Sequence, residues 1–398
     1  MSFSKRILSM DESPIRKLTP YAEEAKSQNK KVYHLNIGQP DIETPHLFMN
    51  KIKNSEEKII SYTNSTGNDE LIDSFIEFYK NYNLAYERDE ILITNGASEG
   101  LLFTLMALGD VGDEVIIPEP FYTNYKGICA SIGLNVVPIT TKIEDSFHLP
   151  PKEDFVNKIT DKTKAILISN PSNPTGVVYT KEEIETIANI AKEHNLYVIS
   201  DEVYRDFVYD DNKFHSFGEI NHIKDRIILI DSLSKRFSAC GARIGSIVSK
   251  NKLLIKEILK LCQLRLCCPM LEQIGATELL KTPKEYVISS LDTYKKRKDV
   301  LYEELKKIPN VTITKPEGAF YIVIKLPVKD AEDFCIWLLK DFSFNNETVM
   351  LAPAKNFYGS SLGHNEVRIA YVIDENELKR ASHVLKIGLE KYILEKGC

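Results

Sequence analysis

The middle of the chain alternates between short β-branched segments and longer amphipathic segments of helical length. This alternation is typical of βαβ units, in which parallel strands pair in one sheet and helices cover both of its faces. It predicts an α/β fold with a mostly parallel seven-stranded sheet flanked by helices. We expect the strands at residues 91–94, 114–117, 135–139, 165–169, 197–200, 226–230 and 243–248.

Longer helical stretches dominate the chain beyond residue 252. With 398 residues the chain exceeds one ordinary hydrophobic core, so we expect two domains that pack together around a cleft. A large domain is expected over residues 46–285, and a smaller α+β domain is expected from both chain ends, residues 1–45 and 286–398. Helices are predicted at 180–194, 252–264, 284–307 and from about Glu375, and further strands at 311–314 and 320–324.

Composition and charge argue against several classes of function. The chain has no run of about 18 apolar residues, so no membrane span is expected, and the absence of a secretory signal pattern favours a cytoplasmic location. Seven cysteines without CxxC spacing indicate reduced thiols rather than a disulfide framework or a metal site. The net charge of −6, with acidic and basic residues interspersed, argues against a nucleic-acid partner. Small-molecule chemistry is therefore favoured.

Polar segments follow four of the predicted strands. In an open α/β sheet, ligands bind beyond the carboxyl ends of the strands, so we expect these segments to meet in one site. The first segment opens a helix with a glycine-containing turn, which can offer backbone N–H groups to a phosphate. Taken one at a time, the segments also have structural interpretations, as a turn, a rigid loop, a helix cap and a solvated lysine. The four are NGASEG (95–100), NPSNPTG (170–176), DEVY (201–204) and DSLSKRFSACGARIG (231–245).

The order and spacing of the last three segments resemble the class I/II aminotransferases, which are pyridoxal-phosphate (PLP) enzymes of fold type I. The resemblance extends over nearly the whole chain, to LNIGQPDIETP, YTNSTG, NGASEG, PEPFYTNY, EGAFY and VRIAY. It implies PLP as the cofactor and the fold of the type I PLP-dependent transferases.

The resemblance also implies a role for each residue of the cofactor site. Lys235 aligns with the lysine that forms the Schiff base with the cofactor and then acts as the general base. Asp201 aligns with the carboxylate that keeps the pyridine nitrogen protonated. Asn173 and Tyr204 resemble the two residues that hydrogen-bond the 3-oxygen of the cofactor. Tyr122 stands where the family has an aromatic ring stacked on the pyridine.

The cofactor phosphate has its own set of aligned residues. Tyr62 resembles the tyrosine that reaches the phosphate of the neighbouring subunit, which implies a homodimer with composite sites. The remaining phosphate contacts are expected from Gly96, Ala97, Ser98, Ser232 and Arg243.

For the substrate, Arg368 aligns with the arginine that pairs with the α-carboxylate, with Asn173 and Gly38 beside it. In one branch of the family a lysine at the position of Ser98 holds the distal carboxylate, so this support for a dicarboxylate is missing here. Arg265 is a replacement candidate, because its segment approaches the partner subunit's cleft in relatives. A salt bridge at the end of a helix is the alternative role for Arg265.

The resemblance thus implies transfer of an α-amino group from an L-amino acid to 2-oxoglutarate by a ping-pong cycle. Aspartate is favoured as the donor, with aromatic amino acids or alanine as competitors. A PLP-dependent β-lyase that cleaves carbon–sulfur bonds, or a carbon–carbon lyase, needs the same residues and stays an alternative. A PLP-sensing regulator is disfavoured, because the pattern begins by about Leu35 and leaves no room for a winged helix. A dehydrogenase is disfavoured because no G-x-G-x-x-G follows the first strand.

Overall fold

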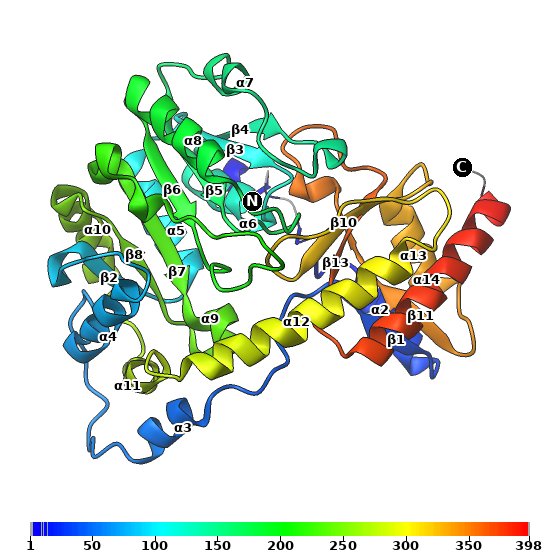
Figure 1. Cartoon of the computed structure of the whole chain (residues 1–398), viewed down its shortest axis with the longest axis horizontal. Coiled ribbons are helices and arrows are strands. Elements are labelled where there is room, and N and C mark those ends of the chain that lie inside the picture. Colours follow the sequence, from blue (N-terminus) through cyan, green and yellow to red (C-terminus); the bar gives the residue numbers. More distant parts are fainter. Residues whose placement is uncertain (1–2, 9, 11, 14, 397–398) are drawn as a thin grey trace.

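A seven-stranded sheet forms the centre of the fold in the computed structural model, which describes residues 3–8, 10, 12–13 and 15–396 (Figure 1). The strand order is β2-β8-β7-β6-β5-β3-β4. Neighbouring strands are parallel except around β8, which is antiparallel to both β2 and β7. The strands are β2 (Ile91–Thr94), β3 (Glu114–Glu119), β4 (Asn135–Thr140), β5 (Thr163–Ser169), β6 (Tyr197–Asp201), β7 (Ile227–Ser232) and β8 (Gly245–Val248).

The predicted sheet is confirmed, with one correction at its last strand. Arg243 was expected to begin that strand, but its backbone adopts the left-handed conformation with φ 54°, so β8 begins only at Gly245. The left-handed residue turns the chain out of the plane of the sheet before the strand starts.

Both faces of the sheet are buried, as a parallel sheet requires. In β5, Ala165 and Leu167 pack with α5 and α10, whereas Ile166 and Ile168 pack with α4 and α8 on the opposite face. These helices are α4 (Asp69–Lys80), α5 (Ala97–Leu108), α8 (Lys181–Glu193) and α10 (Lys252–Arg265).

The helix predicted at 180–194 is present as α8. Thr180 caps it, because the Thr180 side chain accepts a hydrogen bond from the Glu183 N–H at 3.2 Å, and the Glu183 carboxylate accepts one from the Thr180 N–H at 2.7 Å. This reciprocal pair satisfies two backbone donors that the first turn of a helix leaves free.

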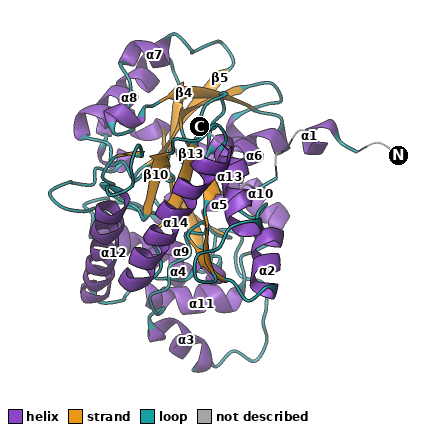
Figure 2. Ribbon diagram, turned by 90° about the vertical axis from the view of Figure 1, so that its right-hand side faces the viewer, coloured by secondary structure: helices purple, strands orange, loops and turns teal. Residues whose placement is uncertain are grey.

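A second region contains a four-stranded antiparallel sheet in the order β12-β13-β10-β9 and a parallel pair of β1 with β11. Figure 2 shows α12 and α14 side by side at this end of the molecule, where α2 packs on α13. The elements are α2 (Thr19–Ser27), β1 (Lys31–His34), α12 (Lys284–Leu305), β9 (Thr312–Ile313), β10 (Tyr321–Lys325), α13 (Ala331–Lys340), β11 (Glu347–Met350), β12 (Ala352–Pro353), β13 (Glu366–Ala370) and α14 (Glu375–Lys396).

Six elements of this region, α2, β1, α13, β11, β12 and β13, were not predicted from the sequence. The strands among them are only two to five residues long, so each offers little periodicity to read. The other short elements are α1 (Lys5–Leu8), α3 (His46–Lys53), α6 (Thr123–Ile132), α7 (Lys152–Val156), α9 (Leu233–Arg236), α11 (Met270–Leu279) and the 3₁₀ helices η1 (Arg88–Glu90), η2 (Ile143–Asp145), η3 (Phe217–Glu219), η4 (Asn221–Arg226), η5 (Cys240–Ala242) and η6 (Lys355–Phe357).

The division into domains at residues 46 and 286 stays a prediction. One hydrophobic cluster supports it, because it joins buried residues of 18–35 to buried residues of 294–392. The same cluster also takes in the segment 203–209 that follows β6, so the two regions meet at the end of this strand. Within the described part of the chain, no helix has both the length and the hydropathy of a membrane span.

Candidate active site

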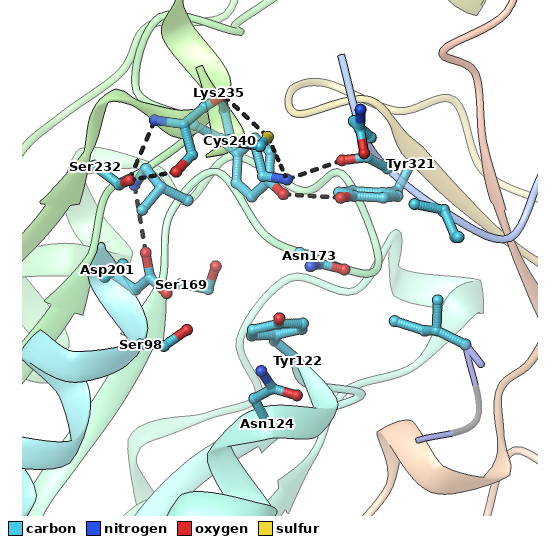
Figure 3. Close-up of a pocket in the computed structure, with 18 of the residues that line it drawn as sticks. Ser98, Tyr122, Asn124, Ser169, Asn173, Asp201, Ser232, Lys235, Cys240 and Tyr321 are labelled. Atoms are coloured by element: carbon cyan, nitrogen blue, oxygen red, sulfur yellow. Dashed lines mark hydrogen bonds between the residues drawn. The ribbon is translucent and has the colours of Figure 1, made fainter. Parts of the chain in front are cut away.

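A cavity of about 660 Å³ opens at the carboxyl ends of the central strands. Ser169, Asp201 and Ser232 end β5, β6 and β7 in turn, and all three line the cavity. Figure 3 shows Lys235 and Tyr321 on one side of it and Tyr122 on the other. The predicted convergence of the strand-end segments is therefore seen in the structure.

Asp201 is a buried carboxylate at the tip of β6, with 5% of its surface exposed. Its Oδ2 accepts a hydrogen bond from the Tyr125 hydroxyl at 2.6 Å, and its Oδ1 accepts one from the Val203 N–H at 3.4 Å. Burial raises the pKa of Asp201 to about 6, against the hydrogen bond from Tyr125, which lowers it. A cationic partner in the cavity would stabilise the ionised form. The protonated ring nitrogen of a pyridine fits this requirement.

Lys235 lies on α9, the single helical turn that follows β7. Ser232 holds this turn in place, since its side chain accepts a hydrogen bond from the Ser234 N–H at 3.2 Å and lies 3.1 Å from the Ile244 carbonyl oxygen. The Lys235 ammonium donates to the Gly38 carbonyl oxygen at 2.8 Å and lies 3.9 Å from the Cys240 sulfur. The structure thus brings Lys235 and Gly38 together across 197 residues of sequence.

The start of α5 and Arg243 form a pocket for an anion. Gly96 precedes the helix with φ 74°, and a Cβ atom there would lie 2.4 Å from Nη2 of Arg243. The guanidinium of Arg243 crosses over this turn and donates to the carbonyl oxygens of Asn95 at 3.2 Å and Cys240 at 3.0 Å. Free N–H groups at a helix start, next to an arginine, fit a phosphate. Around them, Ala97, Ser98, Ser232 and Ser234 line the cavity.

Arg368 is buried on β13, with 1% of its surface exposed. It donates to Oδ1 of Asn173 at 3.0 Å and to the carbonyl oxygen of Asn36 at 2.5 Å. Its Nε has no hydrogen-bond partner among the described residues, and no described carboxylate pairs with it. Burial lowers the pKa of Arg368. A buried cation without a counter-ion fits a carboxylate that arrives with the substrate.

Tyrosines line the space between these charges. The hydroxyls of Tyr204 and Tyr321 lie 2.8 Å apart, and the Tyr122 ring lies edge-on to Tyr125 at 5.6 Å between centroids. Burial raises the pKa of Tyr122 to about 12, so it stays a neutral phenol.

Sequence reasoning assigned no role to several residues that the structure places here. Tyr125 and Tyr321 stand inside the quoted motifs PEPFYTNY and EGAFY, which could have pointed to them. Arg16 also lines the cavity, and no motif singled it out.

Three predicted site residues do not line this cavity, namely Gly96 in the turn before α5, Tyr62 and Arg265. Tyr62 is 80% exposed on the loop before α4. Arg265 ends α10, where it donates to the carbonyl oxygens of Ser65 and Ile93 at 3.3 Å and lies 3.8 Å from the Glu99 carboxylate. The ion pair with Glu99 is the alternative that the sequence left open for Arg265.

Comparisons with known proteins agree with this geometry. The model of the family described as aminotransferase class I and II matches residues 30–385. The aspartate aminotransferase of Bacillus subtilis (strain 168) is 31% identical over 98% of this chain and 100% of the relative. A (5-formylfuran-3-yl)methyl phosphate transaminase of Methanocaldococcus jannaschii is 33% identical, again over 98% of this chain and 100% of the relative. Among solved structures, an alanine aminotransferase from Pyrococcus furiosus superposes with a TM-score of 0.90 at 32% identity, over 98% of this chain and 100% of that chain.

The family match spans most of the chain, and both relatives and the solved structure are matched over almost their full length. The named donors differ between these proteins, but the transfer of an amino group is common to them. The predicted family and cofactor are confirmed: this chain belongs to the class I and II aminotransferases, and it is a PLP-dependent enzyme.

Proposed function

We propose that the enzyme moves an α-amino group from an L-amino acid to 2-oxoglutarate by a ping-pong cycle. The observation that carries the proposal is the convergence of a lysine, a buried carboxylate and a buried arginine on one cavity. When bound there, PLP supplies an electron-accepting ring next to the substrate Cα. The residues that line the cavity would hold this ring and move the proton at the substrate Cα.

Each role follows from the position of a side chain. Lys235 would bind the cofactor through its amine and then move the proton at the substrate Cα. Asp201 would keep the ring nitrogen protonated, since it offers a buried carboxylate at the strand tip. Asn173 and Tyr204 would hydrogen-bond the 3-oxygen of the ring, and Tyr122 would stack on it.

The two arginines would divide the anionic groups between them. Arg243, with Gly96, Ala97, Ser98 and Ser232, would hold the cofactor phosphate at the start of α5. Arg368 would pair with the α-carboxylate of the substrate, with Asn173 and Gly38 beside it.

Aspartate is the donor that we favour, with aromatic amino acids and alanine as competitors. The named relatives support aspartate, because an aspartate aminotransferase matches along nearly the whole chain. The alanine aminotransferase structure, which superposes equally completely, keeps alanine in contention.

We further propose a cytoplasmic homodimer in which Tyr62 of one subunit reaches the phosphate bound by the other. The exposed side chain of Tyr62 supports this, because Tyr62 does not line the cavity of its own chain and is free to contact a second subunit. Its neighbours Ile59 and Ile60 are 74% and 70% exposed, and Leu264 is 81% exposed. Arg265, next to Leu264 at the end of α10, donates a hydrogen bond to the Ser65 carbonyl oxygen, so the helix end and the loop that carries Tyr62 adjoin. Exposed apolar side chains on adjoining segments are what a subunit interface needs.

A half-reaction experiment tests the proposed function. Each amino acid is mixed with the PLP-loaded enzyme, and the change in cofactor absorption follows its conversion to pyridoxamine phosphate. Aspartate should convert the enzyme fastest, and added 2-oxoglutarate should reverse the change. Release of pyruvate and ammonia from cystathionine without an oxo acid would instead indicate a lyase.

Lys235→Ala should lose both this conversion and the absorption of the covalently held cofactor. Reduction with borohydride, followed by mass analysis of peptides, should place the cofactor on Lys235 in the unaltered enzyme. Lys213→Ala, which removes an exposed lysine elsewhere, is the matched control. A reduced adduct on another lysine would refute the assignment.

A further inference from the structure

Arg16 is a cation in the cavity that the roles above leave unused. The charged side chains that line the cavity are Asp201, Lys235, Arg243, Arg368 and Arg16. The cofactor phosphate accounts for Arg243, and the substrate α-carboxylate accounts for Arg368. No described residue forms an ion pair or a side-chain hydrogen bond with Arg16, whose side chain is exposed to the cavity.

The backbone around Arg16 is held firmly even though its side chain is free of partners in the described part of the chain. The N–H groups of Arg16 and Lys17 both donate to the Ser13 carbonyl oxygen, at 3.0 and 2.8 Å. Ile15 packs against the cluster of Ala352, Ala354, Phe357 and Tyr358, and Leu18 is buried in the core of the second region. Residues on both sides of Arg16 are therefore anchored, and the segment presents the guanidinium to the cavity.

Asn36 connects this segment to Arg368. Its side-chain amide donates to the Ile15 carbonyl oxygen at 2.7 Å, and its backbone carbonyl oxygen accepts the hydrogen bond from Arg368 at 2.5 Å. One buried asparagine thus positions both the arginine for the α-carboxylate and the segment that carries Arg16. Two cations set in one cavity by a shared residue suit a substrate with an anionic group at each end.

Tyr122 gives a second sign that the two arginines face the same space. Burial is the main influence on its phenol and raises its pKa, while the charges of Arg368 and Arg16 both act to lower it. Both guanidinium groups therefore lie close enough to Tyr122 to act on it through the low-dielectric interior.

We propose that Arg16 binds the distal carboxylate of dicarboxylic substrates, so that the N-terminal segment of the chain selects aspartate, glutamate and 2-oxoglutarate over substrates with neutral side chains. The proposal rests on the aminotransferase reaction proposed above and names the residue that sets its substrate class. It competes with Arg265, whose guanidinium is already engaged by two backbone carbonyls and lies near Glu99. Ser98, the other position considered, carries no charge.

The test compares donors in the half-reaction for Arg16→Gln. Loss of a hydrogen bond to a charged group should lower kcat/KM for aspartate and glutamate by about 10- to 150-fold, while kcat/KM for alanine changes by less than about 3-fold. Arg16→Lys, which keeps the charge, should restore part of the preference for aspartate. Lys17→Gln is the matched control, because it removes the same charge from the next residue, which pairs with Glu332 and does not line the cavity.

Two results would overturn the assignment while leaving the proposed function intact. In the first, Arg16→Gln lowers kcat/KM for aspartate and for alanine by the same factor, or changes neither value. In the second, Arg265→Gln, and not Arg16→Gln, removes the preference for aspartate. An unaltered enzyme that no amino acid converts would refute the proposed function itself, and the role of Arg16 with it.

Discussion

Gly96 lies in the turn between β2 and α5, next to Arg243, where even one added carbon atom would matter. A Cβ atom on Gly96 would lie 2.4 Å from the Arg243 guanidinium. The backbone there has φ 74°, a conformation that residues other than glycine rarely adopt. Gly112 shares the unusual backbone, with φ 94°, but a Cβ atom there would have no neighbour within 4 Å. Comparing substitutions at Gly96 and Gly112 therefore separates the effect of backbone strain from the effect of disturbing Arg243.

We expect Gly96→Ala and Gly112→Ala each to lower the free energy of unfolding by about 1 kcal/mol or more, since both force alanine into a left-handed conformation. Only Gly96→Ala should also weaken PLP binding, because Arg243 must move away from the phosphate position. Thermal unfolding and titration of the cofactor measure the two effects. Equal loss of PLP affinity in both variants would contradict the role of Gly96.

At the scale of elements, the first turn of α8 is joined to the segment that leads into β10. His148 lies between two carboxylates, 3.0 Å from Glu183 in the cap of α8 and 3.5 Å from Glu317 before β10. Hydrogen bonds to Glu183 and Glu317 raise the pKa of His148 to about 10, from an ordinary value of 6.5. Because the folded pKa lies above the unfolded one, the stabilisation is complete below about pH 6.5 and is lost as the pH rises through about 10.

His148→Gln should therefore lower the free energy of unfolding most at pH 6, by roughly 1–2 kcal/mol after allowance for solvent screening, and the difference from the unaltered protein should shrink toward pH 10. Urea unfolding at both pH values measures it. His222→Gln, at an exposed histidine in η4 with no ion pair to a described residue, should show no such trend. A deficit in His148→Gln that is the same at pH 6 and pH 10 would show that the charge on His148 is not involved.

At the scale of the whole molecule, the proposed composite site can be tested by mixing two defective proteins. Tyr62→Ala should bind PLP poorly and Lys235→Ala should be inactive. In a mixed dimer, one site would combine an intact Lys235 with an intact Tyr62 of the partner subunit. Random exchange of subunits should then restore about a quarter of the unaltered activity, since half of the dimers are mixed and each has one complete site.

Sedimentation of the same mixtures gives the oligomeric state independently. Mixtures that stay inactive although the subunits exchange would show that Tyr62 serves its own chain or no site at all. Ile60→Asp, which places a charge in the exposed apolar segment, should weaken the dimer and serves as a further control.

The sequence alone predicted the seven-stranded sheet because each strand carries its own local signal, a short β-branched run bounded by turns. It also predicted the residues at the strand ends. Asp201 ends the buried strand β6, and Lys235 lies in the helical turn after the buried strand β7. Because the carboxyl ends of parallel strands meet at one edge, their convergence needs no knowledge of distant contacts.

Contacts between distant parts of the chain could not be predicted in this way. The short strands β1 and β11 pair with each other from opposite parts of the chain, and the Glu99 partner of Arg265 is visible only in the folded chain. Arg16 looks like any surface arginine in the sequence.

The fold of the central sheet and the family were thus determined by the sequence itself, through local periodicity and through motifs at the strand ends. Only the tertiary structure decided that Arg16 and Arg368 line one cavity and that Asn36 hydrogen-bonds both Arg368 and the residue before Arg16. The physical reason is that Asn36 and Arg368 lie 332 residues apart, and their hydrogen bond exists only because the two chain ends pack into a common core.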